Sequence, residues 1–77
     1  MEYISERITI DDIICSGKPT IRGMRISVQT ILEFLSAGDT TEYIFKNYPM
    51  LEHDDINSCL KLAGDLLSRS FIIKPVA

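Results

Sequence analysis

The residues best suited to chemistry are two arginines that flank a glycine within residues 17–26 (GKPTIRGMRI). Gly23 and Met24 fit the central positions of a two-residue type II′ turn, which predicts a short β-hairpin with Arg22 and Arg25 opposite each other. Like charges directly across a strand pair repel by up to about 1 kcal/mol, so an anion between them would stabilise the hairpin. That anion could be a phosphate, a carboxylate of a partner, or an acidic side chain of the same chain.

Short strands and a helix must position these arginines. Residues 8–10 (ITI) are typical of a strand, and residues 11–17 of a loop that leads to the hairpin. After the hairpin, Ser27 is a good N-cap for a first helix, which Gly38 ends. The apolar residues of this helix recur at helical spacing: Val28, Ile31, Leu32 and Leu35.

Two more helices follow. Thr40 can cap a second helix over about residues 41–47, because Pro49 prevents its continuation. A third helix is expected from near Glu52 to near Ser70, with acidic residues at its positive N-terminal end. Its predicted apolar stripe consists of Ile56, Cys59, Leu60, Ala63, Leu66 and Leu67.

The predicted fold is a single domain over residues 1–77, mainly α with short β-strands. Its last two helices are joined by a short turn and supported by an earlier helix, which is the order of a helix-turn-helix. Any small three-helix core gives the same pattern, so the pattern alone is weak evidence for DNA binding.

The charge of the chain bears on its partners: 8 Lys and Arg stand against 11 Asp and Glu, a net charge of −3. Domains that act on nucleic acid usually carry a basic balance. If DNA is bound, we expect the phosphate contacts to come from Lys18, Arg22 and Arg25. The acidic start of the third helix makes base reading there costly, and only Asn57 and Lys61 are expected to contribute from this helix.

Catalysis and metal binding are not expected. Cys15 and Cys59 lie far apart, and with the single histidine His53 they fall short of a zinc site, so both cysteines are interpreted as reduced packing residues. Asp54 and Asp55 are adjacent on a helix and point in different directions, which excludes an acid and base pair. We therefore predict neither an enzyme nor a cofactor.

The length of 77 residues predicts self-association. The core of so small a domain rarely supplies more than about 3–5 kcal/mol, so a homodimer is expected to provide the missing stability. No signal segment opens the chain and no apolar run approaches the roughly 18–20 residues of a membrane span, which predicts a cytoplasmic protein without a membrane partner.

Several of these motifs together resemble a small prokaryotic family, the domain of unknown function 433, over about Arg7 to Leu67. The motifs are Gly17-Lys18-Pro19-x-Ile21-Arg22-Gly23-x-Arg25-Ile26-x-Val28, then Gly38, Tyr48-Pro49 and Asp55-Ile56. The resemblance implies a homeodomain-like fold and a dimeric antitoxin, paired with a PIN-like nuclease toxin and binding operator DNA. It implies no catalytic residues. One departure is Glu52, where similar proteins usually have Thr or Ser as the N-cap of the last helix.

The C-terminal residues 71–76 (FIIKPV) are typical of a strand that needs an edge to pair with. This strand could pair with residues 8–10 of its own chain, with the same segment of a dimer mate, or with a toxin by strand addition. Pro75 blunts its outer edge. The residues expected to carry a partner contact are Phe71, Ile72 and Ile73.

The sequence therefore predicts a dimeric, helix-turn-helix-like protein that is the antitoxin or DNA-binding regulatory half of a toxin–antitoxin module. The competing interpretation is an interaction module that binds a protein partner, such as a PIN-like toxin, and never touches DNA. The salt dependence of binding distinguishes the two interpretations, because the affinity of a protein for DNA falls steeply as the salt concentration rises.

Overall fold

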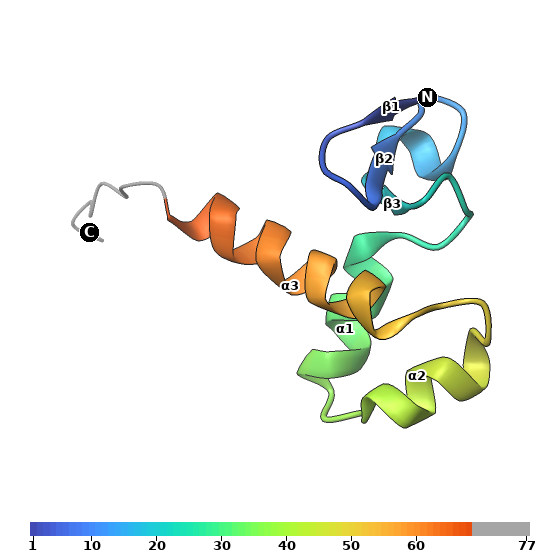
Figure 1. Ribbon diagram of the computed structural model, residues 1–77, viewed down its shortest axis with the longest axis vertical. Coiled ribbons are helices and arrows are strands. Elements are labelled where there is room, and N and C mark those ends of the chain that lie inside the picture. Colours follow the sequence, from blue (N-terminus) through green and yellow to red (C-terminus); the bar gives the residue numbers. More distant parts are fainter. Residues whose placement is uncertain (69–77) are drawn as a thin grey trace, which may run out of the picture.

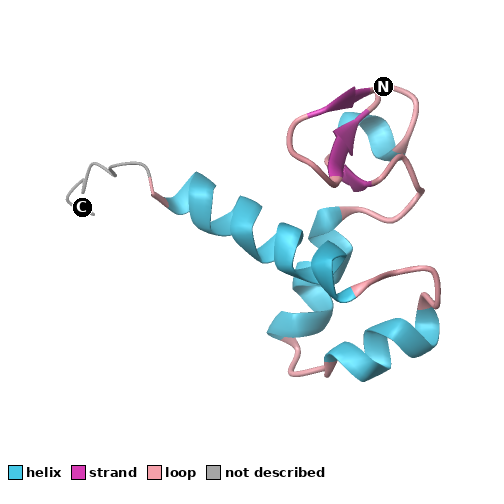
Figure 2. Cartoon of the chain, in the orientation of Figure 1, coloured by secondary structure: helices cyan, strands magenta, loops and turns pink. Residues whose placement is uncertain are grey.

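The computed structural model describes residues 1–68. Within them the chain forms three helices and a small antiparallel sheet (Figures 1 and 2). The strands are β1 (Glu2–Tyr3), β2 (Ile8–Ile10) and β3 (Thr20–Ile21), and the helices are α1 (Val28–Ser36), α2 (Thr41–Asn47) and α3 (His53–Leu67). A 3-10 helix, η1 (Cys15–Gly17), lies in the loop before β3. The prediction of helices with short strands is confirmed, and the strands join into one sheet.

The sheet has the order β1-β2-β3. Ile8 pairs with Ile21 and Thr9 with Thr20, so β2 is the central strand. Both threonines are fully buried, with their Oγ1 atoms 3.0 Å apart. The backbone N–H of Gly23 donates to Thr9 Oγ1 over 2.8 Å. These bonds satisfy the polar groups of a strand pair that is otherwise packed against the core.

Local capping residues set the starts of the first two helices, as predicted. Ser27 Oγ accepts from the backbone N–H of Thr30, and Thr40 Oγ1 accepts from that of Tyr43, each over 3.1 Å. Each bond satisfies one of the N–H groups that a helix start leaves without a partner. α2 ends at Asn47, before the proline that was expected to stop it.

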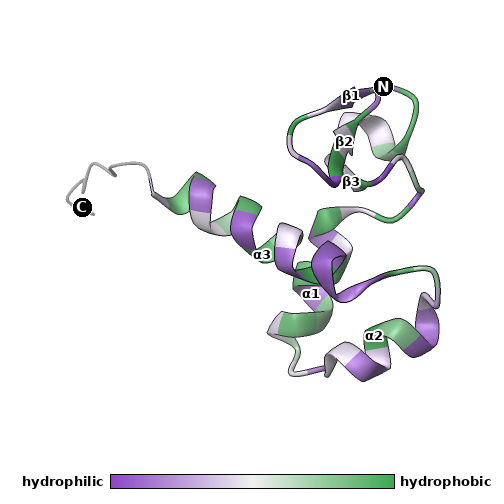
Figure 3. Cartoon of the chain, viewed as in Figure 1, coloured by the Kyte–Doolittle hydropathy of each residue, from purple (hydrophilic) through white to green (hydrophobic). Residues whose placement is uncertain are grey.

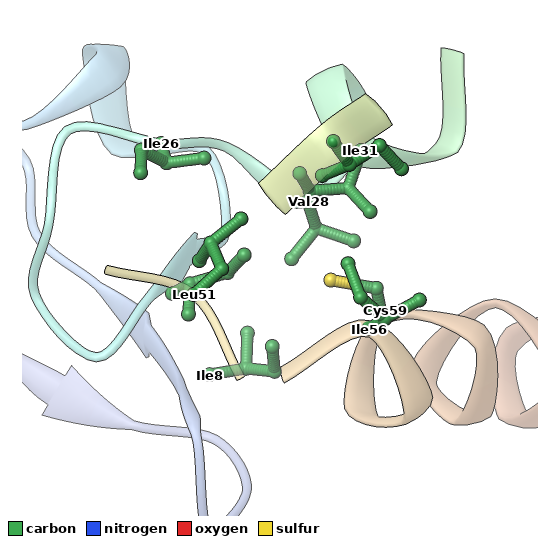
Figure 4. Close-up of a cluster of buried hydrophobic side chains, with 9 residues drawn as sticks. Ile8, Ile26, Val28, Ile31, Leu51, Ile56 and Cys59 are labelled. Atoms are coloured by element: carbon green, nitrogen blue, oxygen red, sulfur yellow. The ribbon is translucent and has the colours of Figure 1, made fainter. Parts of the chain in front are cut away.

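The core lies between the sheet and the helices (Figure 4). It takes one fully buried apolar side chain from each of β2, β3, α1, α2 and α3: Ile8, Ile21, Ile31, Ile44 and Cys59. Cys59 is buried, as predicted, and burial, followed by the charge of Asp55, raises the pKa of its thiol to about 11. The thiol is therefore protonated at neutral pH.

The apolar stripe predicted for α3 is only half correct. Leu60, Leu66 and Leu67 have exposed fractions of 50%, 52% and 67%. The reason is length: the nine residues of α1 span about 14 Å, whereas the fifteen of α3 span about 22 Å, so α1 covers only part of α3. The far half of α3 projects away from α1 (Figure 1).

α3 also ends at Leu67, three residues before the predicted end. The strand predicted over residues 71–76 lies outside the described residues. No helix in residues 1–68 combines the length and the apolar character that a bilayer crossing requires.

Candidate functional site

The turn that carries Arg22 differs from the predicted one. The N–H of Met24 donates to the carbonyl of Ile21 over 2.8 Å, so the central residues are Arg22 and Gly23, with φ of 47° and 72°. Two positive φ values are typical of a type I′ turn, which matches the twist of the flanking strands. The backbone N–H of Ile21 donates to the carbonyl of Ile26 over 3.0 Å and both side chains are buried, but Arg22 is a central turn residue and does not lie opposite Arg25 in a strand ladder.

The anion that Arg22 contacts is a carboxylate of the same chain. Its Nε donates to Asp55 Oδ1 over 3.0 Å and its Nη2 to Asp55 Oδ2 over 2.9 Å. This two-point geometry is the strongest arrangement that a guanidinium makes with a carboxylate. Nη2 also donates to the carbonyl of Met50 over 3.0 Å. Of the three anions that the sequence left open, the structure shows an internal acid, and it is fully buried.

A second arginine, Arg7, contacts the same carboxylate. Its Nη1 donates to Asp55 Oδ1 over 3.1 Å and to Glu52 Oε1 over 2.7 Å. The pairing of Ile8 with Ile21 places Arg7 opposite Arg22, and the N–H of Arg22 donates to the carbonyl of Arg7 over 2.9 Å. Two arginines therefore do face each other across an anion, but the second one is Arg7, which the sequence analysis missed. Only the strand register reveals it.

Asp55 also stabilises the start of α3. Its Oδ2 accepts from the backbone N–H of Glu52, the N-cap residue, over 2.8 Å. With the bonds from Arg7 and Arg22, both carboxylate oxygens have donors. One buried side chain thus joins the strand pair, the turn and the first turn of α3. We call Arg7, Arg22, Glu52 and Asp55 the carboxylate cluster.

Two opposing effects act on the ionisation of Asp55. Burial favours the neutral acid and raises its pKa, but the hydrogen bonds from Arg22, Glu52 N–H and Arg7 outweigh burial and hold the pKa below its usual value. The same contacts raise the pKa of both arginines, chiefly through the bond to Glu52 for Arg7 and through the bond to Asp55 for Arg22. Asp55 is therefore ionised at neutral pH, and it fills the anion position between the two arginines.

The side chains of the other predicted anion-binding residues make no hydrogen bond or ion pair with the cluster within residues 1–68. Lys18 Nζ contacts Gln29 Oε1 at 3.4 Å. Arg25 is exposed, and within residues 1–68 its side chain makes no hydrogen bond or ion pair. Asn57 and Lys61 lie together on α3 beside Arg7, where they line a hollow of about 290 Å³. Lys61 Nζ is 3.6 Å from Asp65 Oδ1.

The structure therefore gathers no open cationic surface from the five predicted residues. Phe71, Ile72 and Ile73 lie outside the described residues. Within residues 1–68 no group of three metal-ligating side chains comes together. The exposed start of α3 is acidic, because Glu52 and Asp54 have side chains 61% and 71% exposed.

An apolar groove of about 660 Å³ runs between α1 and the far half of α3. The sequence analysis missed it because it assigned the leucines of α3 to the core. Its apolar walls are formed by Val28, Leu32, Leu62, Ala63, Leu66 and Leu67. Uncovered apolar surface of this kind marks sites where proteins associate.

Comparison with protein families gives one finding. A family model described as a protein of unknown function (DUF433) matches residues 8–63, which include β2 and β3 of the sheet, all of α1 and α2, and most of α3. Comparisons with curated proteins and with solved structures found no match.

Proposed function

We propose, from the premise that this chain belongs to the DUF433 family of proteins of unknown function, that it is the antitoxin-type component of a two-protein module and acts by binding a protein. The expected partner is a PIN-like nuclease toxin, and the acting species is a homodimer. The observation that carries the proposal is that Arg7 and Arg22 bind an internal carboxylate, while no part of residues 1–68 covers a groove lined mainly by apolar residues.

Electrostatics support a protein partner over DNA. Each phosphate contact needs a cation that can replace condensed counterions. The side chain of Arg22 already makes three hydrogen bonds, two to Asp55 and one to the carbonyl of Met50, and the residue occupies a constrained turn. The acidic start of α3 would repel the phosphates that flank a groove.

The partner proposal is tested by co-expressing the chain with a PIN-like nuclease toxin. We expect growth to be restored, and the joint substitution of Phe71, Ile72 and Ile73 by serine to abolish the rescue, because apolar side chains supply most of the binding energy in such contacts. Colony counts on induction of the nuclease are the measurement.

The matched control is Lys74→Ser, which changes the same segment without removing apolar surface and is expected to retain full rescue. Protein levels are compared by immunoblot so that loss of rescue is not loss of the chain. Absence of rescue by the unaltered chain would contradict the proposal, as would full rescue by the triple variant.

DNA binding is the second candidate function. It is supported by the order of α2 and α3, which are joined by residues 48–52 while α1 packs on α3, as in a helix-turn-helix. The phosphate contacts would come from Lys18 and Arg25, with Asn57 and Lys61 on α3.

This candidate predicts binding of the chain to its own upstream DNA that weakens steeply with salt. Arg25→Glu is expected to weaken the binding at least about tenfold and to reduce the salt slope by about one, because one phosphate contact is lost. Fluorescence anisotropy across a salt series measures both. The control is Glu42→Gln on α2, which is exposed and belongs to neither proposed surface. Binding that does not change with salt would rule this candidate out.

A further inference from the structure

The projecting half of α3 carries an apolar face that nothing within residues 1–68 covers. Leu60, Ala63, Gly64 and Leu67 follow the spacing i, i+3, i+4 and i+7 and therefore share one face of the helix. Leu60 is 50% exposed and Leu67 is 67% exposed. A side chain built at Gly64 would meet no atom within 4 Å, so the middle of this face is open.

This face is continuous with the apolar groove. Ala63 and Leu67 belong to both, since they also line the groove between α3 and α1. In Figure 3, apolar and polar residues alternate along α3, including the part that projects away from α1. The apolar face of α3 and the apolar groove thus lie side by side, so a second copy of the chain could contact both.

We propose that a second copy of this chain covers this surface, with the two α3 helices crossing antiparallel between Ala63 and Gly64. The inference deepens the homodimer of the proposed function by assigning its interface. A two-fold axis at this point places Leu60 opposite Leu67 of the second copy, and Ala63 opposite its Gly64. Small residues meet at the crossing and leucines meet on either side of it, so the backbones can approach closely while the leucines enter the grooves.

The pattern favours a second copy over an unrelated protein because the face matches itself residue by residue under a two-fold rotation, as an isologous contact requires. Its centre is free of charge, which is typical of the buried part of an interface. The nearest charges, Lys61 and Asp65, border this face on the side of α3 that lies near Ile4 and Glu6, and they pair with each other at 3.6 Å. The nine residues of α1 leave room for a second helix along α3.

Sedimentation equilibrium of the full chain tests the interface. We expect a dimer, and we expect Leu60→Glu with Leu67→Glu to raise its dissociation constant at least about thirtyfold, because two charges would be buried at the contact. The matched control, Lys61→Gln, also makes the chain more negative but lies at the border of the face and places no charge in it, so it should leave the dimer intact. Circular dichroism checks that the variants fold, as expected for exposed positions.

A crosslink locates the contact. In a Cys15→Ser background, Gly64→Cys lies next to the two-fold axis and is expected to form a disulfide-linked dimer on oxidation, whereas Lys61→Cys is not. A chain that stays monomeric would overturn the inference, and so would a dimer that the two glutamates leave unchanged. A dimer that behaves as expected but fails to neutralise the nuclease would contradict the proposed function and leave the interface standing.

Discussion

Replacing Asp55 by asparagine is expected to lower the free energy of unfolding by about 3 kcal/mol, because two arginines then face a neutral amide in place of a buried carboxylate. The amide also cannot reproduce the full set of bonds to Arg22, Arg7 and the N–H of Glu52. Urea denaturation followed by circular dichroism measures the loss. Asp54→Asn is the matched control: its side chain is 71% exposed and 3.6 Å from Arg7, so we expect at most about 1 kcal/mol.

The effect of Asp55→Asn should depend on pH in a defined direction. The contacts of Asp55 lower its pKa in the folded chain, so its stabilising contribution is present above the unfolded value of about 3.9 and is lost as the pH falls through the folded value. The difference between the unaltered chain and the variant is therefore expected to be largest near pH 7 and to shrink below about pH 4. A difference that stays constant down to pH 2 would contradict the role given to the ionised carboxylate.

Replacing Arg22 by glutamate is expected to unfold most of the protein at 25 °C. The substitution removes the two-point contact and places a second carboxylate against Asp55, which is fully buried. Breaking a buried ion pair costs about 3–5 kcal/mol, and the whole stability of so small a domain is of similar size. Thermal unfolding followed by circular dichroism is the measurement.

Arg25→Glu is the control for this variant, because it makes the same change of charge three residues away at an exposed side chain. We expect it to melt within a few degrees of the unaltered chain, since surface charges contribute little. Equal destabilisation by both variants would contradict the role of the carboxylate cluster. The contrast also matters for function: a charge reversal at Arg22 cannot test DNA binding, because loss of binding would follow from loss of the fold.

The helices were predictable because local signals define them. Ser27 and Thr40 cap α1 and α2 with their own side chains, and Pro49 limits α2, so neighbouring residues alone fix these boundaries. The turn was placed one residue too late, because the sequence analysis gave the first central position to Gly23. Arg22 takes a positive φ that costs a non-glycine residue about 1 kcal/mol, and its bonds to Asp55 offset that cost from 33 residues away.

The site was less predictable than the helices, because its contacts join residues that lie far apart in the sequence. Two arginines that flank a glycine predicted an anion, but the identity of the anion depends on how α3 packs against the sheet. Arg7 enters the site only through the pairing of Ile8 with Ile21, and nothing in the residues around Arg7 specifies that register. The exposed leucines of α3 were misassigned because periodicity identifies an apolar face without revealing which molecule covers it.

The position of Asp55 has a consequence for how the chain folds. Its partners precede it by 33 and 48 residues, so the carboxylate cluster forms only after most of the chain has been brought together. Until α3 docks, Arg7 and Arg22 repel each other across the strand pair, so the N-terminal sheet is not stable on its own. Sheet and helices should therefore form in one cooperative step. During synthesis, the chain has no stable folded part until the residues of α3 have left the ribosome.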